Sequence, residues 1–200
     1  MTLTAALVVR LLAVAGALAA ARHPRACRGI ALGGSIVASI MTLAIAAQVL
    51  VSGQAAGGVL FRHAASGVVL GYLLTPLSAW FVLVLGLVAV PVAVYSAEYF
   101  AHAVPRSRTA FAVSAFNVLL GALEVVFAAG DVVTFLLAWE LMSLVTAALV
   151  TTDHHSRDSR RAAYLYLVMS HVGTGCLVAG FLLLAGRAGS RHSPPCSPAT

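Results

Sequence analysis

The chain has 200 residues, of which 61% are hydrophobic and only 9% charged, and its mean hydropathy is +1.00. Soluble domains carry about 25% charged residues, so this composition excludes an ordinary soluble domain and indicates an integral membrane protein. All cationic side chains other than histidine are arginines, and all of them except Arg10 lie outside the long apolar runs, in short polar segments. That distribution argues against a nucleic-acid-binding face and leaves the lipid bilayer as the expected environment.

Six apolar runs are each long enough to cross a bilayer, which takes roughly 20 mostly apolar residues in a helix. They are Thr2 to Ala21, Gly29 to Val51, Leu73 to Ala97, Thr109 to Ala129, Asp131 to Thr151 and Ala162 to Ala185. The first run could be misread as a signal peptide, but its charge, Arg10, lies inside the apolar stretch instead of ahead of it. We therefore predict an all-α, polytopic transmembrane bundle of about six spans.

The arginines also predict the orientation of the spans. If the N-terminus is outside, the cytoplasmic connections hold Arg22, Arg25, Arg28, Arg106, Arg108, Arg157, Arg160 and Arg161. The outer side then holds only Arg62, Arg187 and Arg191. Because cytoplasmic loops are enriched in basic residues, we predict that the N-terminus lies outside.

Four segments follow along the chain. Residues 1–72 form two spans and an outer loop, 73–129 the third and fourth spans, and 130–186 the fifth and sixth. Within the first segment, Ser52 to Tyr72 mixes glycines with β-prone pieces, which predicts a small hairpin at the outer surface. Residues 187–200, rich in Ser and Pro, are expected to be disordered and suggest a truncated or frame-shifted product.

Local signals refine the helix ends. Pro76 opens the third span, where its missing N–H costs nothing, while Pro91 lies inside that span and should kink it. Gly130 is expected to end the fourth helix. Asp131 is expected to be a structural cap of the fifth helix, which explains the carboxylate more simply than ion binding does.

The cysteines Cys27, Cys176 and Cys196 show no metal-ligand spacing and are interpreted as unpaired thiols. We find no cofactor or metal motif, so no bound cofactor or metal is expected. His154 and His155 lie in a charged loop, where solvation is the plain explanation.

Three ionisable residues lie within the predicted spans and are expected to converge on a three-helix unit: Glu140, His171 and Glu124. Glu140 and His171 should lie near mid-membrane on consecutive helices, with Glu124 roughly 6 Å shallower. Acids in a membrane are by default functional candidates, and a carboxylate beside a histidine suits proton relay. Each of the three residues also has an explanation that does not involve a proton relay. Glu140 could be held by neighbouring hydroxyls such as Ser143 or Thr146, and His171 could be bonded to a backbone carbonyl or a serine. Glu124 could be reached by water. Arg10 should face protein or extend its head group to the membrane surface.

The segment from Gly130 to Leu144, with Trp-Glu-Leu-Met-Ser at 139–143, resembles the antiporter-like, proton-translocating membrane subunits. These include the large membrane subunits of respiratory complex I, the Mrp antiporters, and hydrogenase-4 component B or formate hydrogenlyase membrane components. The similarity runs from about Leu73 to Leu184, although Thr75 stands where the family usually has Asp.

The resemblance implies an N-terminal portion of a subunit that translocates protons in a redox complex. Glu140 matches the family's fifth-span glutamate, whose lysine partner lies two spans later, and this chain contains no lysine. Electron transfer would belong to partner membrane subunits of a hydrogenase or complex I-like assembly in a bacterial or archaeal cell membrane. One alternative is a non-transporting structural or assembly remnant. An intramembrane enzyme has little support, because no nucleophile–base spacing or metal-binding His/Glu motif occurs.

Overall fold

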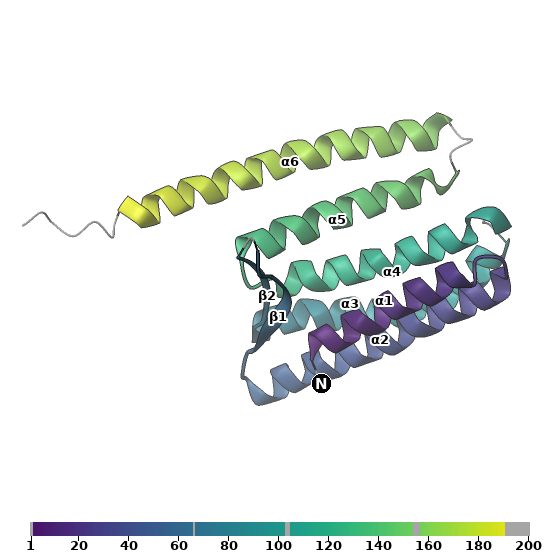
Figure 1. Ribbon diagram of the computed structural model, residues 1–200, viewed down its shortest axis with the longest axis horizontal. Helices are drawn as coiled ribbons and strands as arrows, with labels where there is room; N and C mark the ends of the chain where they lie inside the picture. The colour runs from purple at the N-terminus through teal and green to yellow at the C-terminus, as the bar shows by residue number, and fades with distance from the viewer. Residues whose placement is uncertain (1, 66, 103–104, 154–156, 191–200) are drawn as a thin grey trace, which may run out of the picture.

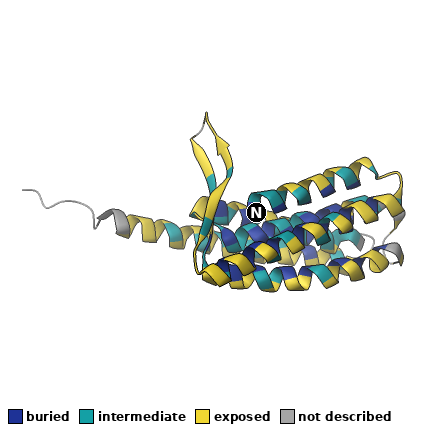
Figure 2. Cartoon of the chain, turned by 90° about the horizontal axis from the view of Figure 1, so that it is seen from below, coloured by how far each residue is buried: buried dark blue, intermediate teal, exposed yellow. Residues whose placement is uncertain are grey.

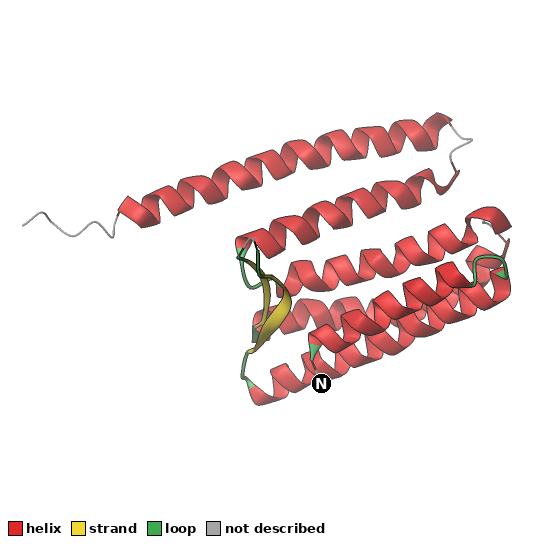
Figure 3. Cartoon of the chain, in the orientation of Figure 1, coloured by secondary structure: helices red, strands yellow, loops and turns green. Residues whose placement is uncertain are grey.

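The computed structural model describes residues 2–65, 67–102, 105–153 and 157–190. In chain order, the elements are α1 (Leu3–Ala19), α2 (Pro24–Ser52), β1 (Ala56–His63), β2 (Val68–Leu74), α3 (Pro76–His102), α4 (Arg106–Ala128), α5 (Val132–Val150), the 3-10 turn η1 (Thr151–Asp153) and α6 (Arg157–Ser190). The helices run up and down in one bundle, and a hairpin lies at one end (Figures 1 and 3). The predicted all-α polytopic class is confirmed.

Five of the described helices, α2 to α6, are long and apolar enough to cross a membrane, and α1 is shorter. With 17 residues, α1 measures about 26 Å at 1.5 Å per residue, below the roughly 30 Å of a bilayer core. Its chain leaves the helix at Ala20 and turns toward Pro24, which starts α2. The expectation of about six spans is therefore met by five helices of spanning length and one shorter helix.

Packing is uneven across the bundle. The helix α2 contacts α1, α3 and α4, whereas α5 packs on α4 and α6 packs on α5. One apolar cluster near the hairpin includes Leu3, Tyr72 and Leu74, and a second cluster toward the opposite end includes Cys27 and Val113. Both clusters lie among α1 to α4 and the hairpin, so α6 presents most of its surface outward (Figure 1).

The predicted hairpin is present between α2 and α3. Strands β1 and β2 pair antiparallel, with a bulge between Val59 and Phe61, and the hairpin stands out across the helix direction (Figure 2). The third helix begins at Pro76, as the proline in its first turn predicted, while Leu73 and Leu74 at the start of the apolar run extend β2 and pair with Gly57 and Ala56.

Gly130 has a different role from the predicted helix end, because α4 already ends at Ala128. The Gly130 N–H donates to the Gly71 carbonyl oxygen at 3.0 Å. A Cβ at this position would lie 3.2–3.3 Å from backbone atoms of Gly71 and Tyr72. Glycine is therefore required here for the close approach of the α4–α5 junction to β2.

Helix α6 continues further than expected at its C-terminal end. Residues 187–190 were predicted to be disordered, but they complete the last turn of α6, which ends at Ser190. The rest of that tail, residues 191–200, lies outside the described residues, as do His154 and His155. At Pro91 the helix α3 continues without interruption.

Candidate functional site

Glu140 on α5 and His171 on α6 lie side by side within the membrane-spanning part of the bundle. The His171 Nε2 atom is 3.6 Å from Glu140 Oε2, and the two side chains are 54% and 29% exposed. They come from consecutive antiparallel helices, as the depth estimate from the sequence predicted. The contact is longer than a hydrogen bond and leaves both side chains reachable from outside the bundle.

The second ring nitrogen of His171 limits the protonation states of this pair. Its Nδ1 atom lies 2.8 Å from the Leu167 carbonyl oxygen, which can only accept, so Nδ1 carries a hydrogen. When the ring is neutral, Nε2 is therefore a bare acceptor facing Glu140. One proton then lies either on Nε2, beside a carboxylate, or on Glu140, beside a neutral ring.

The other carboxylate oxygen, Glu140 Oε1, is buried and has no hydrogen-bond partner among the described residues. Neither hydroxyl considered from the sequence holds this carboxylate. The Ser143 hydroxyl donates to the Glu140 backbone carbonyl at 2.9 Å, and the Thr146 hydroxyl donates to the Met142 carbonyl at 2.8 Å. Among the described residues, Glu140 thus has one ionisable neighbour, His171, and one carboxylate oxygen, Oε1, that can still accept a hydrogen bond.

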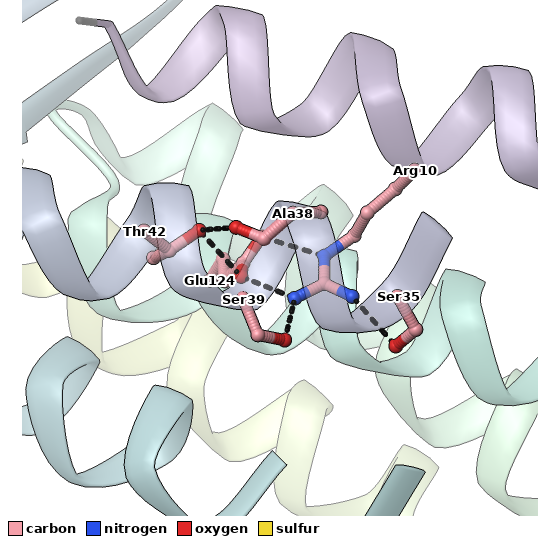
Figure 4. Close-up of polar contacts among 6 residues, drawn as sticks. All are labelled: Arg10, Ser35, Ala38, Ser39, Thr42 and Glu124. Carbon is pink, nitrogen blue, oxygen red and sulfur yellow. Dashed lines mark hydrogen bonds and ion pairs between the residues drawn. The ribbon is translucent and has the colours of Figure 1, made fainter. Parts of the chain in front are cut away.

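Glu124 on α4 forms a tight ion pair with Arg10 on α1 (Figure 4). Arg10 Nη2 lies 2.6 Å from Oε1 and Arg10 Nε lies 3.0 Å from Oε2, so the contact is bidentate. The side chains are only 3% and 1% exposed. Arg10 therefore faces protein, one of the two orientations considered, and Glu124 is closed to water from outside, contrary to the expected access.

Hydroxyl groups of α2 complete this second site. Arg10 donates to Ser35 Oγ at 3.2 Å and to Ser39 Oγ at 2.9 Å. The Thr42 hydroxyl lies 2.9 Å from both the Ala38 carbonyl oxygen and Glu124 Oε1. Ser35, Ser39 and Thr42 follow the i, i+4, i+7 spacing of one helix face, which is a sequence signal that could have pointed to this site.

The ionisable residues thus form two sites instead of the single convergence that was expected. Glu124 turns toward α1 and α2, while Glu140 turns toward α6. Sequence reasoning missed the partnership of Arg10 with Glu124. The available signal was an arginine about seven residues from the outer end of the first span, opposite in charge to Glu124 and at similar depth.

Asp131 is the N-cap residue of α5, and its carboxylate accepts from the Thr134 N–H at 2.8 Å. The same carboxylate accepts from the Thr134 hydroxyl at 2.6 Å and from the Gly71 N–H at 3.1 Å. Burial raises the pKa of Asp131, but the hydrogen bonds from Thr134 and Gly71 outweigh it and leave the pKa below its usual value. The cap therefore joins α5 to the hairpin.

Within the described ranges, no three His, Cys, Asp or Glu side chains gather as metal ligands. Cys27 and Cys176 are free thiols, and Cys196 lies outside the described residues. Glu140 and His171 are groups that could exchange a proton, whereas both carboxylate oxygens of Glu124 in the separate Arg10–Glu124 site accept hydrogen bonds.

Comparison with known proteins gives one family match. Residues 129–194 match the family model described as NADH:quinone oxidoreductase/Mrp antiporter, transmembrane. Two uncharacterized proteins from two strains of Mycobacterium tuberculosis are 36% identical to this chain over 114 residues. The alignment covers 57% of this chain and 17% of each relative, so the chain spans a small part of the curated relatives it matches.

Among solved structures, a similar fold occurs in a chain of the membrane-bound sulfane sulfur reductase, an archaeal respiratory membrane complex. The TM-score is 0.61 with 18% sequence identity, and the match covers 90% of this chain and 38% of the other. At that identity the likeness concerns the fold.

Proposed function

Because residues 129–194 match the model of the NADH:quinone oxidoreductase/Mrp antiporter membrane family, we propose that the chain belongs to this family and contributes to proton translocation in a membrane-bound redox complex. Glu140 and His171 are the proton-exchanging pair in this proposal. The observation that carries it is the His171 Nδ1 contact with the Leu167 carbonyl oxygen. It leaves one proton to be shared between Nε2 and the Glu140 carboxylate.

The loose geometry of the pair supports exchange. A contact of 3.6 Å between Glu140 and His171 is weak enough to be broken and re-formed at small cost, and Glu140 Oε1 has capacity for a further partner. Imidazole and carboxylate groups are the side chains that most often transfer protons in proteins, so the pair has the chemistry that exchange requires.

Glu124 takes a supporting part in proton coupling in this proposal. Protonating it would leave Arg10 as a buried cation without its counter-ion, which is costly. We therefore assign to Glu124 the task of fixing α4 against α1 and α2, on which α5 and its Glu140 are positioned. A proton would reach Glu124 only with a rearrangement of Arg10.

The partners in this proposal are other membrane subunits of a hydrogenase-4-like or complex I-like assembly in a bacterial or archaeal cell membrane. Support comes from the respiratory complex to which the similar fold belongs. Further support comes from the outward surface of α6, where Met169 is 71% exposed and Leu182 is 68% exposed. Electron transfer would be carried out by partner subunits.

The test is the Glu140→Gln variant in the assembled complex, with proton translocation measured together with electron transfer. We expect translocation to be lost while the complex still assembles. The matched control is Glu98→Gln, because Glu98 also contacts a histidine, His102, at 3.4 Å but lies exposed at a helix end. If Glu140→Gln translocates protons as well as the control does, the proposal is wrong.

A structural or assembly role without transport is the second candidate. It is favoured by the buried Arg10–Glu124 site, in which both carboxylate oxygens accept hydrogen bonds and α4 is held against α1 and α2. On this reading, Glu140→Gln would leave translocation unchanged, and only loss of the Arg10–Glu124 pair would impair the complex, through its assembly.

A further inference from the structure

A cavity of about 350 Å³ lies between α1, α4 and α5, with the hairpin at its outer end. Most of its lining is apolar, but Arg10 of α1 and Asn117 of α4 both border it. Buried polar groups are normally hydrogen-bonded, so the partners of these two side chains show whether the cavity is dry.

Asn117 has an unused acceptor. Its side chain is fully buried, and its Nδ2 atom donates to the carbonyl oxygens of Ala31, at 3.0 Å, and Val113, at 3.1 Å. Because carbonyl oxygens only accept, this orientation of the amide is fixed. The remaining atom, Oδ1, has no hydrogen-bond partner in the described part of the chain.

Arg10 has an unused donor. A guanidinium group carries five N–H donors. Four of them go to Glu124 Oε1 and Oε2, Ser39 Oγ and Ser35 Oγ. The bond to Ser35 is made by Nη1, which has two hydrogens, so one of them has no acceptor among the described residues.

The groups on α2 that these two side chains contact indicate the scale of the gap between the unused donor and the unused acceptor. Asn117 contacts Ala31 of α2, and Arg10 Nη1 contacts Ser35, one turn further along the same helix. Four residues of helix advance about 6 Å. Two hydrogen bonds through one water span roughly 5.5 Å, and each water needs about 30 Å³ of the cavity.

A third buried polar side chain, that of Ser114, lies on the same side of α4 as Asn117. Ser114 precedes Asn117 by three residues, a spacing that places side chains on one face. It is 7% exposed, and its Oγ atom also has no hydrogen-bond partner within the described ranges. Ser114, Asn117 and Glu124 lie along one side of α4 over about 15 Å and are called the polar seam below; of the three, Asn117 borders the cavity.

We propose that this seam is a hydrated site, in which ordered water accepts from Arg10 Nη1, donates to Asn117 Oδ1 and continues toward Ser114. The water satisfies the unpaired groups and places an exchangeable O–H group beside the Arg10 guanidinium, without requiring that Glu124 change its protonation. The site is separate from Glu140 and His171, so it stands whether or not they exchange a proton.

The test uses D2O as the probe and infrared spectroscopy of single cysteine thiols, whose S–H hydrogen is replaced by deuterium only where water reaches. Ser114→Cys and Val113→Cys are compared in the chain carrying Cys27→Ala, Cys176→Ala and Cys196→Ala. Val113 is fully buried in an apolar cluster next along the helix, and Cys27 belongs to that cluster. Native Cys27, kept alone in the Cys176→Ala and Cys196→Ala chain, is therefore the natural dry reference.

We expect Ser114→Cys to exchange at least about tenfold faster than Val113→Cys and Cys27, and Asn117→Leu to slow that exchange, because burial protects thiol hydrogens. Ser35→Cys, at the other end of the water bridge, supplies a second position if Ser114→Cys does not fold, and should also exchange fast. Exchange at Ser114→Cys or Ser35→Cys as slow as at Val113→Cys would overturn the proposal.

Discussion

Two acid–base pairs occupy the same bundle and differ in contact distance, burial and hydrogen bonding. Arg10 and Glu124 make a bidentate contact of 2.6 and 3.0 Å and are almost completely buried. Glu140 and His171 meet at 3.6 Å, are partly exposed and leave one carboxylate oxygen without a partner in the described part of the chain.

The difference shows how a membrane helix bundle can separate stability from proton exchange. A buried ion pair is costly to break, because removing one partner leaves an isolated charge. A loose pair that includes histidine can change protonation with little effect on packing. The strength of each contact therefore predicts which substitution affects folding and which affects function.

The largest effect should come from breaking the buried pair. Arg10→Met or Glu124→Gln should each lower the free energy of unfolding by about 3–5 kcal/mol, since each strands a polar or charged partner. Denaturant titration in lipid discs measures this. The double variant Arg10→Met/Glu124→Met should regain much of the loss, because it removes both charges. A double variant as unstable as the sum of the single ones would contradict the pairing.

A middle-sized effect is expected at the junction of α5 with the hairpin. Asp131→Ala removes the bonds to the Thr134 and Gly71 N–H groups and should cost about 1–2 kcal/mol, as loss of a helix N-cap does. Asp131→Asn, which keeps an acceptor oxygen, should lose less. Thermal unfolding of the three chains under one condition checks this order.

The contribution of Asp131 should also depend on pH. Its pKa is lowered in the folded chain, so the stabilisation is complete above the unfolded-state pKa and is lost as the pH falls through the folded-state pKa. The stability difference between the native chain and Asp131→Asn should shrink in acid and stay flat near neutrality. A stability difference between the two chains that stays the same as the pH is lowered into the acid range would refute this.

The smallest effect on stability is expected at the loose pair. Glu140→Gln and His171→Gln should change the free energy of unfolding by about 1 kcal/mol or less, as is usual for partly exposed ion pairs. The same denaturant titration gives the value. A loss as large as that of Glu124→Gln would erase the distinction between the two sites.

Much of the fold could be predicted from local patterns in the sequence. Five of the six apolar runs correspond to helices of spanning length, and the glycine-rich stretch between the second and third runs contains the hairpin. Pro76 marked the start of α3 correctly, but the apolar run was counted from Leu73, because Leu73 and Leu74 are as suitable for a strand as for a helix.

The site was predicted less completely, for a physical reason. Glu140 and His171 lie on consecutive helices, so depth alone brings them together. Arg10 and Glu124 are 114 positions apart, and their contact depends on how α1 and α4 pack side by side. Ser35, Ser39 and Thr42 mark a polar face of α2, but the local sequence does not say which helices pack against it.

The central claim is that Glu140 exchanges a proton and Glu124 does not. Infrared difference spectra of the chain in lipid discs, recorded at a series of pH values, test it. We predict a carboxyl band that changes with pH in the native chain, disappears in Glu140→Gln and persists in Glu124→Gln. A band that survives Glu140→Gln and vanishes in Glu124→Gln would contradict the account.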